Sequence, residues 1–303
     1  MSSTLAQAMD KNTSMVDETL EQLLLPTMDL PESLRKAMRY SLFAGGKRLR
    51  PTLVLAAAEC CGLDPRKALK TAAALEMIHT YSLIHDDLPA MDDDDLRRGK
   101  PTNHKVFGEA MAILAGDGLL TKAFEAAAAN ASDLKLNGPA AAELIRLIAF
   151  GAGAEGMVGG QVADLAAEGL RRKLSKSAAA RTLKNVHRRK TGALIVASLD
   201  AGALLAGATE LRRDALRQYG ECIGLAFQIA DDILDVVGDK KKMGKRGSDA
   251  DNDKLTYASL HGVDGARAKA RAAVEMAHAN LKPFGKKART LHELADYIIA
   301  RDK

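Results

Sequence analysis

The sequence predicts an all-α protein, a single-domain bundle of long helices over residues 1–303, and three observations support this prediction. Helix-forming residues such as Ala, Leu, Lys and Glu are abundant, whereas aromatic residues make up only 4% of the chain and Trp is absent. Only eight prolines interrupt the 303 residues. No window shows the alternation of apolar and polar residues that a half-buried strand requires.

Most of the chain divides into amphipathic helices joined by short turns that contain Gly, Pro or Asp. Pro31 and Pro51 suit the first turn of a helix, and Gly62, Gly207 and Gly238 suit helix ends. No shift in composition marks a linker and no internal repeat stands out, which favours one domain over several. The predicted helices cover residues 31–43, 51–62, 65–88, 107–129, 138–155, 157–168, 177–205, 210–236, 254–260, 264–280 and 287–302.

Charge and cysteine content exclude several classes of protein. The net charge is only +5, the basic residues are dispersed and aromatic residues are scarce, so we expect no nucleic-acid partner. Cys60, Cys61 and Cys222 are odd in number and form no CxxC pair, which indicates reduced thiols. Residues 1–25 lack the apolar core of a signal peptide, and no stretch has the roughly 18 apolar residues of a membrane span. We therefore expect a cytoplasmic protein without a transmembrane segment.

Residues 86–95 form a dense acidic cluster in which six of ten residues are Asp. Carboxylates packed this closely repel one another, so the cluster needs either full solvation or neutralising cations. An exposed acidic loop is the simpler interpretation. The preceding residues argue against it, because His79, Ser82 and Asp86 are three and four residues apart and share one helical face. Polar groups on an apolar helix indicate a hydrated cavity or a ligand.

Pro89 brings the members of this cluster together. Proline ends or bends a helix, because it lacks the amide proton and clashes with the preceding turn. On a continuous helix Asp86 and Asp92 would point about 120° apart, but a break at Pro89 lets Asp92 fold back beside Asp86. Carboxylate oxygens gathered in this way are the ligands that Mg²⁺ prefers.

A second acidic cluster lies in a strongly helical stretch, residues 227–235. Asp231 and Asp235 are four residues apart and share a face, with Gln228 one turn earlier. Apolar residues such as Ile229 and Ile233 flank them, so this is not an exposed charged face. Two facing walls of carboxylates would hold several divalent ions between them, an arrangement that suits a diphosphate leaving group.

Basic residues accompany both acidic clusters. A Gly-containing turn between two predicted helices, residues 45–51, supplies three cations for phosphate oxygens, and two arginines follow the first cluster directly. Dispersed cations beside two metal-binding walls indicate two anionic groups held at once, although the run at residues 240–242 also fits a flexible surface loop. The basic residues concerned are Lys47, Arg48, Arg50, Arg97, Arg98, Lys190, Lys240, Lys241, Lys242, Lys245 and Arg246.

With these motifs the chain resembles the trans-isoprenyl diphosphate synthases, and among them the bacterial farnesyl diphosphate synthases, from about residue 40 to the end. The order and spacing of five motifs make the resemblance specific. At residue 258 the chain has Ala where the family usually has Pro, which affects only a local turn. The five motifs are GGKRLRP at 45–51, DDLPAMD at 86–92, GGQVADL at 159–165, KT at 190–191 and FQIADDILD at 227–235.

The resemblance implies a helical bundle of the isoprenoid synthase type around a deep central cavity, assembled as a homodimer. It implies Mg²⁺-dependent 1'-4 condensation of isopentenyl diphosphate with dimethylallyl or geranyl diphosphate. It further implies two or three Mg²⁺ ions per site, with three aspartates as ligands and two in support. The ligands would be Asp86, Asp92 and Asp231, and the supporting residues Asp87 and Asp235.

The same resemblance assigns the substrate-binding residues. The allylic diphosphate would be held by Arg97, Lys190 and Lys245. The isopentenyl diphosphate would be held by Lys47, Arg50, His79 and Arg98. The residues expected near the reacting carbons and the hydrocarbon chain are Thr191, Phe227 and Gln228.

The length of the product would depend on Tyr81, five residues before Asp86, with Ser82 one turn below that aspartate. A bulky residue at this position resembles the farnesyl-type members, so we expect a C15 product, although Tyr81 also fits a plain core aromatic. A geranylgeranyl diphosphate synthase with a C20 product is the main alternative. A class I terpene cyclase needs only one diphosphate site, and a non-catalytic subunit would not need intact aspartate clusters with Lys47 and Arg50.

Overall fold

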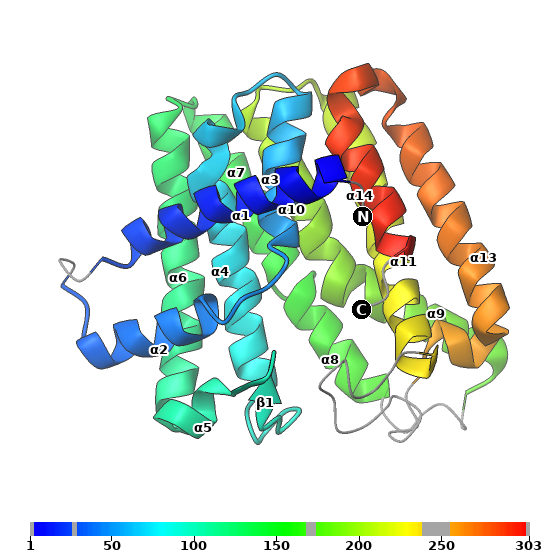
Figure 1. The fold of residues 1–303 in the computed structure, drawn as a ribbon, viewed down its shortest axis with the longest axis horizontal. Coiled ribbons are helices and arrows are strands. Elements are labelled where there is room, and N and C mark those ends of the chain that lie inside the picture. The colour runs from blue at the N-terminus through cyan, green and yellow to red at the C-terminus, as the bar shows by residue number, and fades with distance from the viewer. Residues whose placement is uncertain (1–2, 26–28, 168–173, 238–254, 301–303) are drawn as a thin grey trace.

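The computed structural model describes residues 3–25, 29–167, 174–237 and 255–300, and it confirms the all-α prediction (Figure 1). The helices pack as one bundle, in which the long helices α4, α6, α10 and α11 run beside one another. The α-helices are α1 (Ser3–Leu23), α2 (Glu32–Leu42), α3 (Leu49–Cys60), α4 (Leu69–Asp86), α5 (Asn103–Phe107), α6 (Glu109–Asp133), α7 (Gly138–Ala152), α8 (Met157–Ala167), α9 (Lys176–His187), α10 (Ala193–Leu205), α11 (Glu210–Val237), α13 (Tyr257–Asn280) and α14 (Arg289–Ala300).

Six predicted helices are confirmed to within a few residues, namely α2, α3, α7, α8, α11 and α14. Others differ from the prediction. Gly108, with φ at 85°, separates the unpredicted α5 from α6, and the two helices predicted at 254–260 and 264–280 form one element, α13, that bends at Gly262, where φ is 69°. The predicted helix 177–205 contains a π-helical turn, η2 (Arg188–Gly192), between α9 and α10, and short 3₁₀ turns η1 (Pro65–Ala68) and η3 (Lys282–Ala288) precede α4 and α14.

A small antiparallel hairpin follows the first acidic cluster, and the sequence did not predict it. Strand β1 (Leu96–Arg97) pairs with β2 (Lys100–Pro101), so that Arg97 lies opposite Lys100. The two turn residues, Arg98 and Gly99, have φ of 53° and 76°. Positive φ at both positions is the geometry of a tight hairpin turn, and it directs the Arg98 side chain away from the strands.

Helix α1 is the largest element that the sequence analysis missed. Its residues Leu5, Met9, Val16 and Leu20 are buried at helical spacing, and they pack onto the bundle although the helix as a whole is polar. In Figure 1, α1 crosses in front of α3 and α4. Its stability therefore comes from tertiary packing rather than from strong local signals.

The apolar core ties the two ends of the described chain together. One cluster contains Leu5 and Met9 of α1 together with Leu291 and Leu294 of α14, as well as residues of α3, α10 and α11. A second cluster joins α2, α4, α6 and α7. Segments distant in sequence thus share one core. No helix within the described ranges is both long and apolar enough to cross a membrane.

A buried ion pair fixes the start of α3. Arg48 is only 3% exposed, with φ at 45°, and its guanidinium donates to Glu76 (2.8 Å), Asp17 (2.9 Å) and the carbonyl of Leu42 (2.7 Å). Sequence analysis grouped Arg48 with Lys47 as a cation for phosphate oxygens, and this was wrong. The left-handed backbone at Arg48 turns its side chain into the core, where all of its bonds are made within the protein.

Replacing Arg48 is therefore expected to destabilise the fold. Arg48→Met leaves the carboxylate of Glu76 buried and unpaired, which costs about 3–5 kcal/mol. The exposed neighbour provides the matched control, since Lys47→Ala should change the free energy of unfolding by less than about 0.5 kcal/mol. Urea denaturation of both variants measures the difference, and equal stabilities would contradict the structural role of Arg48.

Candidate active site

The two acidic clusters lie at the ends of two long helices. Asp86 is the last residue of α4, and Asp231 and Asp235 lie in the last two turns of α11. Both helices end on the same side of the bundle, next to the hairpin and α8 (Figure 1). This side of the molecule therefore carries the acidic residues of both motifs.

The chain folds back after α4 as predicted from Pro89. The amide of Asp92 donates to the carbonyl of Asp86 at 2.9 Å, and the amide of Asp93 donates to the carbonyl of Leu88 at 3.1 Å. Asp93 adopts a left-handed conformation, with φ at 49°, within this turn. The predicted proximity of Asp92 to Asp86 is thereby confirmed, although only their backbones are joined directly.

Burial makes the ionised form of the carboxylates in the first cluster energetically unfavourable. Burial raises the pKa of Asp86 to about 6, with a further increase from Asp92, although Lys190 lowers it. Burial also raises the pKa of Asp87, and this rise is opposed by the Nε of Arg97, which donates to both carboxylate oxygens at 2.7 and 2.9 Å. Arg97 and Asp87 therefore neutralise each other, whereas the charge of Asp86 has no such bidentate partner.

The aspartates of the second cluster have two different roles. Asp232 is buried and accepts a hydrogen bond from the amide of Tyr257 at 2.6 Å, which fixes the start of α13. Asp231 and Asp235 lie on a different face, which they share with Gln228 and Gly224 at spacings of three and four residues. A Cβ on Gly224 would lie 3.2 Å from the Cα of Gly192, so this face of α11 packs closely on η2.

Lys190 connects the two clusters, because it lies on η2 and its charge also acts on Asp86. Its ammonium donates to Asp164 of α8 at 2.6 Å. Gly160 allows this approach, since a Cβ there would lie 2.1 Å from the amide nitrogen of Lys190. Asp164 received no role from the sequence, although its place in the GGQVADL motif was a signal. The π-helical turn at Lys190 is of a kind found frequently at functional sites.

A group of cations gathers beside the first cluster. Burial lowers the pKa of Arg50 to about 10, an effect that the charge of Glu76 opposes and the charge of Arg98 assists. Burial, followed by the charges of Arg50 and Arg98, lowers the pKa of His79 well below its ordinary value. The Nε of Arg50 is buried and has no hydrogen-bond partner among the residues that the structure describes. Mutually repelling cations with an unused donor are well suited to binding an anion.

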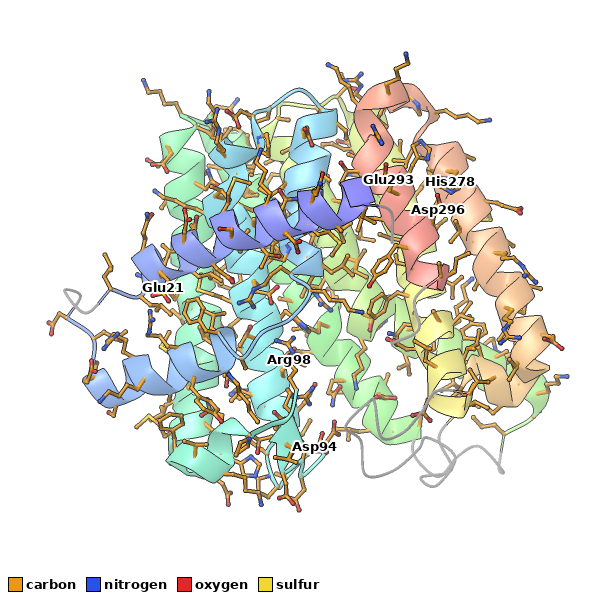
Figure 2. All side chains as sticks on the ribbon, in the orientation of Figure 1. Glu21, Asp94, Arg98, His278, Glu293 and Asp296 are labelled. Atoms are coloured by element: carbon orange, nitrogen blue, oxygen red, sulfur yellow. The ribbon has the colours of Figure 1, made fainter. Side chains whose placement is uncertain are left out.

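Gly46 makes this cationic group possible. The guanidinium of Arg98 lies so close to Gly46 that a Cβ there would be 2.6–2.8 Å from it. Figure 2 shows Arg98 between the hairpin and the α2–α3 connection, whereas Asp94 lies at the lower edge of the molecule. The glycines of the basic turn thus bring the turn and the hairpin together.

The remaining predicted residues have varied surroundings. The ammonium of Lys47 lies 5.7 Å from the ring centre of Tyr297. Phe227 packs against the apolar cluster shared by α1 and α14. Ser82 donates its hydroxyl proton to the carbonyl of His79 at 2.9 Å, so its donor serves its own helix. Thr191 and Gln228 are half-buried and Tyr81 is buried, while Lys245 lies outside the described residues.

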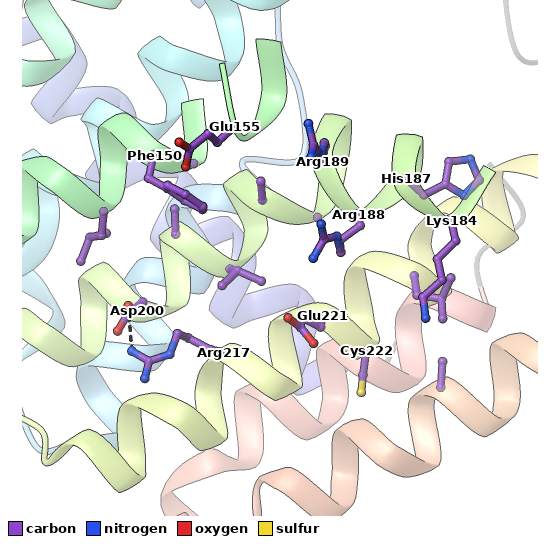
Figure 3. A pocket seen from close by; sticks show the side chains of 18 of the residues that line it. Phe150, Glu155, Lys184, His187, Arg188, Arg189, Asp200, Arg217, Glu221 and Cys222 are labelled. Atoms are coloured by element: carbon purple, nitrogen blue, oxygen red, sulfur yellow. Dashed lines mark hydrogen bonds and ion pairs between the residues drawn. The ribbon is translucent and has the colours of Figure 1, made fainter. Parts of the chain in front are cut away.

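A large cavity lies apart from the acidic clusters. It has a volume of about 830 Å³ and lies among α7, α9, η2, α10, α11 and α13 (Figure 3). None of the predicted site residues within the described ranges lines it, so it is not the central cavity expected from the sequence. A cavity of about 30 Å³ is lined by Asp87, Arg97 and Arg98.

The first acidic cluster fits Mg²⁺ by its chemistry. No three His, Cys, Asp or Glu side chains of the described ranges form a ready-made metal site. The available donors are nevertheless carboxylate oxygens, which Mg²⁺ prefers together with water and phosphate oxygens. The raised pKa of Asp86 also shows that its ionised form lacks sufficient positive charge nearby. Asp86, Asp92 and Asp231 remain the predicted ligands.

Comparison with known proteins agrees with these features. The model of the polyprenyl synthetase family matches residues 31–295. A farnesyl diphosphate synthase of Bacillus subtilis is 49% identical over 91% of both chains, and a chloroplastic geranylgeranyl pyrophosphate synthase of Capsicum annuum is 46% identical over 95% of this chain and 76% of its own. The apo structure of an FPP/GFPP synthase from Zymomonas mobilis superposes with a TM-score of 0.85 at 40% identity, covering 99% of this chain and 100% of that one.

Asp86→Asn is expected to stabilise the metal-free protein at pH 8. A folded-state pKa raised from 3.8 to about 6 means that the ionised carboxylate disfavours folding. This free-energy cost is absent at a pH below the pKa that Asp86 has in the unfolded chain, and it is fully present above about pH 6. The shift of about two pKa units corresponds to about 1–3 kcal/mol. Urea denaturation in EDTA should show the gain at pH 8 but little gain at pH 4. A variant less stable than the wild type at pH 8 would contradict this account.

Proposed function

We propose that this chain, which belongs to the polyprenyl synthetase family, is a prenyltransferase that condenses isopentenyl diphosphate with dimethylallyl and then geranyl diphosphate to form farnesyl diphosphate. The observation that carries the proposal is the pairing of a costly carboxylate cluster at Asp86 with an adjacent cluster of repelling cations. The carboxylate cluster suits a diphosphate bound through metal ions, and the cationic cluster suits a diphosphate bound by basic side chains alone.

The cationic group is the proposed site of isopentenyl diphosphate. The charge of Arg98 lowers the pKa of Arg50, and a bound diphosphate would relieve this repulsion. Guanidinium groups bind phosphate oxygens in a bidentate manner, so they also orient the ligand. His79 is neutral in this environment and is able to donate a single hydrogen bond. Lys47 completes the proposed set.

The acidic clusters with Lys190, Arg97 and Lys245 are the proposed site of the allylic diphosphate. Mg²⁺ bound there would neutralise the leaving diphosphate, a contribution of roughly several kcal/mol. Lys190 lies between the two acidic helices, where it can pass from Asp164 to a diphosphate oxygen. Asp87 and Arg97 hold each other, which keeps this arginine in a fixed position.

The proposed reaction begins when the allylic C–O bond breaks and the diphosphate leaves with the electron pair. The double bond of isopentenyl diphosphate then attacks the allylic cation, and loss of a proton restores a double bond. We propose that the released diphosphate accepts this proton, so no side-chain base is required. The protein contributes orientation, which supplies up to about 7–11 kcal/mol of the barrier, and exclusion of water from the cation. Thr191 and Gln228 are the proposed neighbours of the reacting carbons.

The relatives favour a C15 product, and the Tyr81 side chain agrees with this. Two matched proteins, at 49% and 48% identity, are named as farnesyl diphosphate synthases. Geranylgeranyl diphosphate synthases share 46% identity, so the C20 product is the second candidate. Tyr81 is buried on α4 below Asp86, where its bulk would limit the growing chain.

We further propose a cytoplasmic homodimer. Apolar side chains that are at least 40% exposed occur on α6, α7 and α8, and a second copy of the chain would cover such a surface. The three cysteines are free thiols, as expected in a reducing compartment. The exposed apolar residues on these helices are Ile113, Leu114, Phe150, Val158, Val162 and Leu165.

Incubation of the protein with dimethylallyl diphosphate, isopentenyl diphosphate and Mg²⁺ is expected to yield farnesyl diphosphate, which chromatography detects. The same incubation in EDTA is expected to yield no farnesyl diphosphate. A C20 product would favour the geranylgeranyl alternative. Cyclised hydrocarbon from geranyl diphosphate alone would favour a terpene cyclase. Absence of diphosphate release with both substrates would favour a non-catalytic subunit and would refute the proposed function.

Tyr81→Ala is expected to shift the product toward C20 or longer. Removing the ring deepens the space below Asp86, so the C15 product is retained for another condensation. The readout is the ratio of C20 to C15 after incubation with excess isopentenyl diphosphate. An unchanged ratio would mean that Tyr81 is only a core residue.

A further inference from the structure

The ring of Tyr81 rests against a second ring on the same helix. His85 lies one turn after Tyr81 on α4, and the two ring centres are 5.7 Å apart with an interplanar angle of 82°. Edge-to-face pairs of this kind have a preferred geometry, so a change in the position of His85 changes the position favoured for Tyr81. The proposed reaction assigns no role to His85.

His85 is held in a slot on α6. Its Nε2 lies 3.1 Å from the carbonyl oxygen of Ile113, which can only accept, so Nε2 carries the proton and donates it. At Gly116 a Cβ would lie 2.1 Å from this Nε2 and 2.5 Å from Cδ2. Only glycine leaves room for the imidazole at this depth. Gly116 and the Ile113 carbonyl together fix where the His85 ring sits.

We infer that His85, seated against Gly116, is a positioning residue that sets the place of the Tyr81 ring and thereby the length of the product. This inference rests on the proposed function, because it concerns the depth of the same substrate site. Tyr81 is 6% exposed and packed in the core, so its ring has few alternative positions while His85 remains in the slot. When His85 leaves the slot, Tyr81 gains space on the α6 side and retracts from the growing chain.

The sequence alone gave no indication of this arrangement. Gly116 lies 31 residues after His85 and belongs to a Gly-Asp-Gly segment inside a long helix. Glycine in a helix interior costs roughly 1 kcal/mol relative to alanine, so its presence calls for a packing reason. For Gly116 the reason is the His85 ring, and for Gly118 it is contact with Met38, whose sulfur would lie 3.2 Å from an added Cβ.

Gly116→Ala is the direct test, because it displaces the His85 ring without changing any residue of α4. We expect the ratio of C20 to C15 product to rise about tenfold, the discrimination typical of small changes in an apolar pocket. The KM for farnesyl diphosphate as the allylic substrate should fall, with a smaller change for geranyl diphosphate. Gly118→Ala is the matched control on the same helix. Its methyl group meets the flexible ends of the Met38 and Leu34 side chains, and its product ratio should equal that of the wild type.

His85→Ala provides a second route should Gly116→Ala fold poorly, and it should also lengthen the product. The double variant Gly116→Ala with His85→Ala should match His85→Ala alone, since the added methyl group then has no ring to displace. The inference is overturned if the wild type makes C15 and both single variants do the same, or if Gly118→Ala shifts the ratio as much as Gly116→Ala. A wild type that makes no prenyl diphosphate would instead refute the proposed function.

Discussion

The cost of burying the carboxylate of Asp86 is the constraint on which this side of the molecule depends. Burial raises its pKa to about 6, and the nearby Asp92 increases the cost. A fold optimised only for stability would remove such a group, so its retention fits a site prepared for a cation. The neighbouring cations also repel one another, because the charge of Arg98 lowers the pKa of Arg50 and both arginines lower the pKa of His79. The carboxylate of Asp86 and the guanidinium groups of Arg50 and Arg98 are therefore available to bind ligands.

The surrounding bundle keeps these unfavourable groups in place. The buried pair of Arg48 and Glu76 fixes the turn that presents Arg50, and Asp232 fixes the helix that follows the second cluster. Glycines allow the close approaches that the site needs, at Gly46 beside Arg98 and at Gly160 beside Lys190. Both sets of contacts hold the residues of the site in place against their mutual repulsion.

Local patterns predicted much of this arrangement, and long-range contacts account for what they missed. Pro89 correctly indicated the end of α4 and the return of Asp92 to Asp86. The inward orientation of Arg48 was not predictable, because it depends on Glu76 and Asp17, which lie 28 and 31 residues away. Helix α1 was missed since its apolar stripe gains stability only when it packs on the bundle. The large cavity likewise arises from packing among six elements and has no counterpart in any single motif.

The account as a whole rests on the two aspartate clusters acting on one ligand. The most direct measurement is a crystal structure with Mg²⁺ and a non-cleavable allylic diphosphate analogue. The account predicts metal ions that bridge the diphosphate to Asp86 on one side and Asp231 on the other, with Lys190 moved from Asp164 onto a phosphate oxygen. A diphosphate bound away from either aspartate, or bound in the large cavity beside Arg188, would contradict it.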